Sequence, residues 1–345
     1  MKTRRVGRVA LQALVSAAVL IALLIAARRG DVLARLRELA PGAVVAAVGM
    51  QLAACALNGR RWQVLLGRLG VRERLGTLTA LYLVGMFFSL FLPTSAGGDA
   101  VRIYQVARRS GRPGAALLAT LQERLLGLGT TLLIGLSAML YYWSALPSVL
   151  RLWGVVLQIA GVAAVCLLLY PGPLLAAAGW VWGRCKQRPT WQRLAARPAL
   201  TRLRTGLRSL AGVPVLKPSQ LLHLLALAGT AALLGISTCP VLGQSLGIDV
   251  GVTAFCLVIP LVWLVRMLPV SLNGIGVGEG AFVFLVGLFG VPADKGLALA
   301  LALLGMQTTV GLIGGAVFVL RLAGGTWRNV REEPAIPMEE ARHAA

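Results

Sequence analysis

The chain has 345 residues, of which 57% are hydrophobic and only 13% charged, and its mean hydropathy is +0.79. Because soluble domains are about one-quarter charged, the composition excludes a water-soluble globular, fibrous or disordered chain and indicates a polytopic membrane protein. The formal net charge of +22 favours a positive-inside topology and contact with anionic inner-leaflet lipids, with no role in nucleic acid binding.

Long apolar runs with few charges predict six membrane-spanning helices. Each run is long enough to cross about 30 Å of hydrocarbon at about 1.5 Å per residue. The predicted ranges are 9–27, 41–58, 116–142, 149–170, 221–243 and 297–320.

Two further apolar regions, 77–112 and 252–290, are interrupted near their middle. Proline, paired glycines and asparagine do not continue a helix, and broken backbone at membrane depth needs protein or a wet cavity to satisfy it. Each region therefore predicts a helical hairpin. The residues expected to set the hairpin geometry are Pro93, Gly97, Gly98, Pro269, Asn273, Gly274 and Gly276.

The distribution of basic residues decides how these regions lie in the membrane. If both are re-entrant, 26 of the 34 Lys and Arg residues lie on the cytoplasmic side, including the nine in segment 171–220. If 77–112 crossed the membrane, that segment would lie outside, against the positive-inside rule. The predicted fold is an all-α polytopic membrane protein with six full spans, two re-entrant helical hairpins and both termini inside.

The order of elements then repeats within a single membrane domain. Residues 1–145 form a first repeat that starts inside, and residues 146–325 form a second that starts outside and contains the basic cytoplasmic segment 171–220. Such an inverted-topology repeat is the architecture of many secondary transporters. The end of the chain, 326–345, is predicted to be a disordered tail.

Six ionisable residues are predicted within the membrane, where each is costly and is a functional candidate by default. They are Asp99, Arg102, Glu123, Arg124, Arg266 and Glu279. The two hairpins enter from opposite faces, so their tips are expected to meet near the midplane, where transporters of this design hold substrate. A guanidinium group forks onto two oxygens, which makes the arginines candidates for binding an anionic headgroup.

A purely structural interpretation of these charges remains open. Asp99 and Arg102 lie three residues apart on one helical face and can neutralise each other. Pairs of Arg102 with Glu123, or of Arg266 with Glu279, would equally be structural.

Three motifs in order resemble those of a known family. They are Phe91-Leu92-Pro93-x-x-x-Gly97-Gly98-Asp99-x-x-Arg102, then Glu123-Arg124, then Pro269-x-Ser271-x-x-Gly274-x-Gly276-x-x-Glu279-Gly280, with Arg61-Trp62 similar too. Together they resemble the transmembrane domain of lysylphosphatidylglycerol synthase over essentially the whole chain. This resemblance implies a domain that flips a lipid between leaflets.

In the two-domain synthases a separate soluble domain makes the aminoacylated lipid. The longest polar stretch of this chain is about fifty residues, so we expect no synthase domain here. The resemblance carries signature positions onto Asp99, Arg102, Glu123, Arg124 and Glu279. The acid expected near the end of the second half is absent, and Gln307 is the nearest polar residue.

The sequence therefore predicts a flippase-like protein of the bacterial cytoplasmic (inner) membrane that translocates or binds a lipid with an anionic or modified headgroup. The alternative is a membrane-embedded transferase, or an accessory scaffold for one, acting on a lipid-linked substrate. No catalytic motif or metal-ligand spacing occurs, so neither enzymatic activity nor a cofactor is expected. A homo-oligomer or a lipid-biosynthesis partner is compatible with the sequence.

Overall fold

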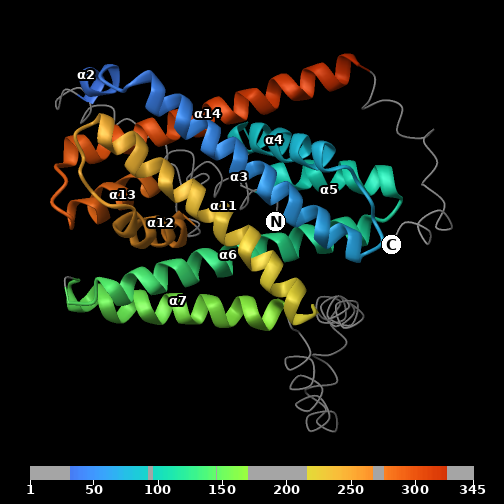
Figure 1. Cartoon of the computed structure of the whole chain (residues 1–345), viewed down its shortest axis with the longest axis horizontal. Coiled ribbons are helices and arrows are strands. Elements are labelled where there is room, and N and C mark those ends of the chain that lie inside the picture. Colours follow the sequence, from blue (N-terminus) through green and yellow to red (C-terminus); the bar gives the residue numbers. More distant parts are fainter. Residues whose placement is uncertain (1–31, 92–95, 145, 170–215, 267–275, 325–345) are drawn as a thin grey trace, which may run out of the picture.

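The computed structural model describes residues 32–91, 96–144, 146–169, 216–266 and 276–324. The described part of the chain is helical and contains no strand, which confirms the predicted all-α class (Figure 1). The predicted span 9–27, almost all of the basic segment 171–220 and the tail 326–345 lie outside the described residues.

Within the described part of the chain, four helices are long and apolar enough to cross a membrane. They are α3 (Pro41–Arg68), α6 (Pro113–Tyr141), α11 (Pro218–Ser245) and α14 (Ala293–Ala323). A fifth, α7 (Ser148–Leu169), carries a shorter apolar stretch and lies along α6 (Figure 1). Three of the long helices begin with proline, whose fixed φ suits the first helical position. Helices therefore occupy five of the six predicted spans.

One of these helices extends well beyond its predicted end. The apolar run of the second span stops at residue 58, but α3 continues to Arg68. The extension is held by packing, because Trp62, Leu65 and Leu66 are fully buried against α4, α6 and their neighbours. Arg61, which follows the predicted span and which the charge distribution counts on its cytoplasmic side, therefore lies on a helix inside the bundle.

Each interrupted region forms two helices that pack against each other, as expected of a hairpin. The helices are α4 (Leu75–Phe91) with α5 (Ala96–Ser110), and α12 (Val252–Arg266) with α13 (Val277–Gly287). Gly276 caps α13 at a φ of 88°, which favours glycine. Four of the predicted hairpin residues, Pro93, Pro269, Asn273 and Gly274, lie outside the described residues.

The packing partners correspond between the two halves of the chain. Helix α3 packs on α11, which is its counterpart in the predicted repeat (Figure 1). The first hairpin arm of each half packs on the last span of the other half, α4 on α14 and α12 on α6. The second arms pack within their own halves, α5 on α6 and α13 on α14. Exchanging the halves thus preserves the pattern of contacts.

Glycines allow the close approach of α4 and α14. A Cβ atom on Gly314 would overlap the carbonyl oxygen of Leu83, and one on Gly315 would overlap the ring of Phe87. Small residues of this kind let transmembrane helix backbones approach, since apolar burial alone drives little association within lipid.

Replacing Gly314 with alanine is expected to lower the free energy of unfolding by about 1–3 kcal/mol, because the added methyl group pushes α4 away from α14. The matched control is Gly305→Ala in the same helix, where an added Cβ meets nothing within 4 Å. The control should be neutral or slightly stabilising, since alanine favours the helix. Thermal unfolding in detergent measures both variants, and equal melting temperatures would contradict this account.

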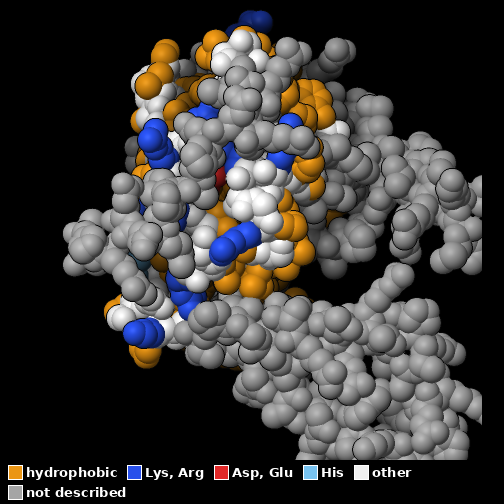
Figure 2. All heavy atoms as spheres, turned by 90° about the vertical axis from the view of Figure 1, so that its right-hand side faces the viewer, with side chains coloured by type: hydrophobic (Ala, Val, Ile, Leu, Met, Phe, Trp, Pro, Cys, Tyr) orange, Lys and Arg blue, Asp and Glu red, His pale blue; other side chains and the backbone are white. Residues whose placement is uncertain are grey.

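Two surface features fit a membrane environment. On α7, the side chains of Val149, Leu152 and Trp153 are each at least 60% exposed. At one end of the bundle Lys and Arg side chains gather on the surface (Figure 2). The last turn of α5, which carries Arg108 and Arg109, lies at this end (Figure 1), and such a gathering of basic residues fits the cytoplasmic side of a membrane.

Candidate functional site

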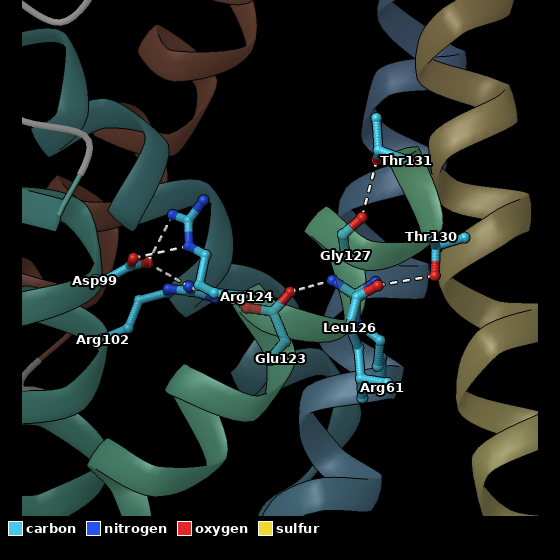
Figure 3. A network of polar contacts seen from close by, with 9 residues as sticks. All are labelled: Arg61, Asp99, Arg102, Glu123, Arg124, Leu126, Gly127, Thr130 and Thr131. Carbon is cyan, nitrogen blue, oxygen red and sulfur yellow. Dashed lines mark hydrogen bonds and ion pairs between the residues drawn. The ribbon is translucent and has the colours of Figure 1, made fainter. Parts of the chain in front are cut away.

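The first hairpin and the helix that follows it are joined by a forked ion pair. Arg124 on α6 donates from Nε to Asp99 Oδ2 and from Nη2 to Asp99 Oδ1, both at 2.8 Å (Figure 3). Asp99 lies in the first turn of α5, where the positive end of the helix dipole stabilises a carboxylate. The Asp99 side chain is 15% exposed and that of Arg124 is 46% exposed, so this pair faces open space.

A second set of charges lies deeper. Glu123 accepts a hydrogen bond from Arg61 on α3, and its other oxygen lies 3.4 Å from Arg102 Nη2. The same Nη2 atom donates to Asp99 (Figure 3). The side chains of Arg61, Glu123 and Arg102 are at most 4% exposed. We call these three residues the buried triad, and together with Asp99 and Arg124 the charged cluster.

Aromatic rings and glycines hold Arg102 in place. Its guanidinium carbon lies 5.0 Å from the centre of the Trp62 ring and 4.3 Å from that of Tyr82, within the range of cation–π attraction. A Cβ on Gly98 would overlap the Gly85 carbonyl oxygen, so only glycine lets α5 approach α4 here. This approach places the α5 residues Asp99 and Arg102 beside α6.

The charged cluster forms part of the wall of a cavity of about 400 Å³, which we call the main cavity. Helices α3, α6 and α11 contribute most of its lining residues, and α4, α5, α12 and α14 contribute fewer. Arg61, Asp99, Glu123 and Arg124 all line it. Uncharged polar side chains complete its wall: Gln51, Asn58, Tyr82, Thr131, Thr238 and Gln307. The cavity thus combines apolar walls with hydrogen-bonding groups, as ligand sites do.

The second hairpin carries its own ion pair. Arg266 Nη2 at the end of α12 donates to Glu279 Oε1 at 2.8 Å, and the Gly276 N–H donates to Glu279 Oε2 at 2.5 Å. A Cβ on Gly278 would overlap the Arg266 side chain. This pair borders a small cavity of about 50 Å³, which shares Ile259, Trp263, Leu303 and Gln307 with the main cavity.

Glu279 makes two different contacts, which two substitutions can separate. Glu279→Gln keeps an oxygen for the Gly276 N–H but loses the charge that pairs with Arg266, whereas Glu279→Ala loses both. We expect both variants to be destabilised, with alanine worse by about 1–2 kcal/mol, because the buried N–H is then unsatisfied. Unfolding in detergent measures the difference, and equal stability of the two variants would contradict a capping role.

The structure thus brings the six predicted residues into two groups and not into one. Asp99, Arg102, Glu123 and Arg124 lie together. Arg266 and Glu279 form the separate pair of the second hairpin, and their cavity adjoins the main one through shared walls. The pairs that the structural interpretation named are all present.

Sequence reasoning left one member of the charged cluster out of the candidate site. The charge distribution places Arg61 on the cytoplasmic side of the predicted span, although Arg61-Trp62 is one of the motifs that carry the family resemblance. Both residues now prove central, because Arg61 pairs with Glu123 and Trp62 lies against Arg102. Among the described residues, no group of three or more His, Cys, Asp or Glu side chains could hold a metal ion.

Part of the chain is similar to a protein named Glycosyltransferase AglD from Haloferax volcanii. The identity is 34% over 115 residues, which cover 31% of this chain and 18% of that relative. The match thus spans less than a fifth of the relative's length.

Most of the chain, residues 9–315, matches the family described as Lysylphosphatidylglycerol synthase TM region. The match runs from the predicted first span to the last turns of α14 and confirms the resemblance drawn from the motifs. It includes the charged cluster, both hairpins and both cavities. The chain therefore belongs to the lysylphosphatidylglycerol synthase TM region family and is an integral membrane protein.

Proposed function

We propose that this protein translocates a lipid with an anionic or modified headgroup between the leaflets of the bacterial cytoplasmic membrane. The observation that carries the proposal is the main cavity, a space of about 400 Å³ that opens next to the Asp99–Arg124 ion pair amid apolar helices. Its volume lies within the range of about 300–1,000 Å³ typical of ligand sites. Membership of a family named for a lipid synthase supports a lipid as the ligand.

In this proposal the headgroup enters the main cavity and the acyl chains stay in the bilayer. The headgroup meets Arg124 and the uncharged polar side chains of the wall. Rocking of residues 1–145 against 146–325 would change the leaflet to which the cavity opens. The matching packing of the two halves supports such a motion, because it makes two equivalent arrangements conceivable.

The test is lipid exchange by the full chain reconstituted in phosphatidylcholine liposomes. Trace amounts of fluorescent phosphatidylglycerol, phosphatidic acid or a polyprenyl phosphate report movement, because an added quencher bleaches only the outer leaflet. In empty liposomes about half of the fluorescence is lost, and we expect liposomes with the protein to lose clearly more than half for at least one lipid. Bleaching that stops at half for every lipid would overturn the proposal.

A second candidate, a membrane-embedded transferase or its accessory scaffold, is favoured by the partial similarity to Glycosyltransferase AglD. The two candidates differ in the fate of the lipid. Incubating the reconstituted protein with labelled nucleotide sugars and polyprenyl phosphate yields a new lipid-linked sugar only if the protein is a transferase. A translocase moves the lipid to the other leaflet and leaves its mass unchanged.

A further inference from the structure

The charged cluster divides into a buried part, whose side chains are held by their own contacts, and a part that is exposed. In the buried triad, Glu123 contacts both Arg61 and Arg102, and none of the three side chains is more than 4% exposed. Arg61 and Glu123 also border the main cavity, but Arg124 differs from both because 46% of its side chain is exposed. The geometry leaves Arg124 as the cation of the cluster that an incoming ligand can reach.

The charges of the cluster do not cancel. Three arginines face two carboxylates, so the cluster carries one excess positive charge. In a low-dielectric interior this excess attracts an anion and disfavours a second cation. The site therefore suits a headgroup that brings net negative charge.

Arg102 makes the Asp99–Arg124 pair exchangeable. Asp99 contacts two arginines at once, Arg102 on its own helix and Arg124 on α6. If Arg124 leaves, Asp99 still has Arg102, and no carboxylate is stranded in the membrane interior. An unpaired carboxylate there would be strongly unfavourable, so this second contact removes the main obstacle to the exchange.

We propose that Arg124 exchanges its forked contact with Asp99 for the same contact with a phosphate group that carries at least two non-bridging oxygens. A carboxylate and a phosphate present the same pair of oxygens to a guanidinium fork. The inference rests on the proposed function, because it takes the main cavity as the headgroup site. Asp99 then acts as a competitor that occupies Arg124 until the phosphate arrives.

This competition predicts that removing Asp99 strengthens phosphate binding. The probe is dihexanoyl phosphatidic acid, titrated calorimetrically into the detergent-solubilised full chain, with dihexanoylglycerol as the phosphate-free comparison. Asp99→Asn should bind the phosphatidic acid about tenfold more tightly than the natural chain, since one charge-assisted contact no longer has to be broken. Arg124→Gln should bind it at least tenfold more weakly, and Arg124→Lys, which keeps the charge but loses the fork, should fall between.

Matched controls remove the same charges at positions that line neither cavity. Asp249→Asn and Arg74→Gln alter exposed side chains in connecting segments and should leave the affinity unchanged. Size-exclusion profiles and melting curves confirm that each variant is folded. Unchanged or weaker binding by folded Asp99→Asn, or full binding by Arg124→Gln, would overturn the exchange.

Two further arms separate the source of the phosphate and the two proposals. If inorganic phosphate displaces phosphatidic acid from the protein, the free ion suffices as a ligand. If inorganic phosphate does not displace it, the phosphate must belong to a lipid. In both cases the exchange at Arg124 stands. If the variants bind phosphatidic acid with the expected order of affinities but no lipid crosses the bilayer, the translocase proposal is overturned and the exchange at Arg124 stands. If the protein exchanges lipid between leaflets and the Asp99 and Arg124 variants do so at the same rate, the exchange at Arg124 is overturned and the translocase proposal stands.

Discussion

Glu123→Gln is expected to lower the free energy of unfolding by about 3–5 kcal/mol, the usual cost of removing one partner from a buried ion pair. The substitution keeps the shape of the side chain but leaves Arg61 without an opposing charge, and both positions are at most 4% exposed. Arg102 suffers less, because Asp99 still accepts its hydrogen bond. Denaturant unfolding of the protein in detergent micelles measures the loss.

The double variant Arg61→Met/Glu123→Gln serves as the matched control. It removes the stranded cation and replaces it with an apolar side chain of similar length, an exchange that is often close to neutral in buried pairs. The double variant should therefore be more stable than Glu123→Gln alone. If instead the losses in free energy of unfolding from the two single substitutions simply add, Arg61 and Glu123 are not energetically coupled, which would contradict the ion pair of the buried triad.

Arg124→Gln is expected to reduce lipid exchange in liposomes at least tenfold while leaving the fold intact. The loss follows because the charge-assisted contacts to a headgroup are worth about 1.5–3 kcal/mol, and about 1.4 kcal/mol corresponds to a factor of ten. The fold survives because Arg124 is half exposed and the buried triad does not depend on it. Rates of fluorescent lipid bleaching, together with melting curves, measure both effects.

Arg74→Gln provides the comparison, because it removes the same charge from an exposed arginine in the segment between α3 and α4, which does not line the main cavity. Its exchange rate should match that of the natural chain. If both variants slowed lipid exchange equally, the loss of one positive charge anywhere would explain the effect, and a specific contact of Arg124 with the headgroup would be contradicted.

Much of the fold follows from local patterns in the sequence. Apolar runs locate α3, α6, α7, α11 and α14 to within a few residues at most ends. Broken runs locate both hairpins. The end of α3 was the exception, because a run of polar and basic residues ended the hydropathy signal, while packing of Trp62 and its neighbours continued the helix.

The candidate site was predictable in its members more than in its arrangement. Charges within apolar runs single out Asp99, Glu123 and Arg124 because each needs a partner at membrane depth. The pair of Asp99 with Arg124 was not among those expected, because it depends on the close approach of α5 to α4 at Gly85 and Gly98. Arg61 was missed because its partner lies 62 residues further along the chain.

The charged cluster also bears on how the chain is made. All five of its residues come from α3, α5 and α6, which belong to the first 141 residues, so its charges can neutralise one another before the later helices leave the ribosome. The contact of α4 with Gly314 instead waits for α14, which follows these helices by more than 150 residues. Charge neutralisation can thus accompany insertion of the first half, whereas the close packing of α4 on α14 is completed only when α14 is in place.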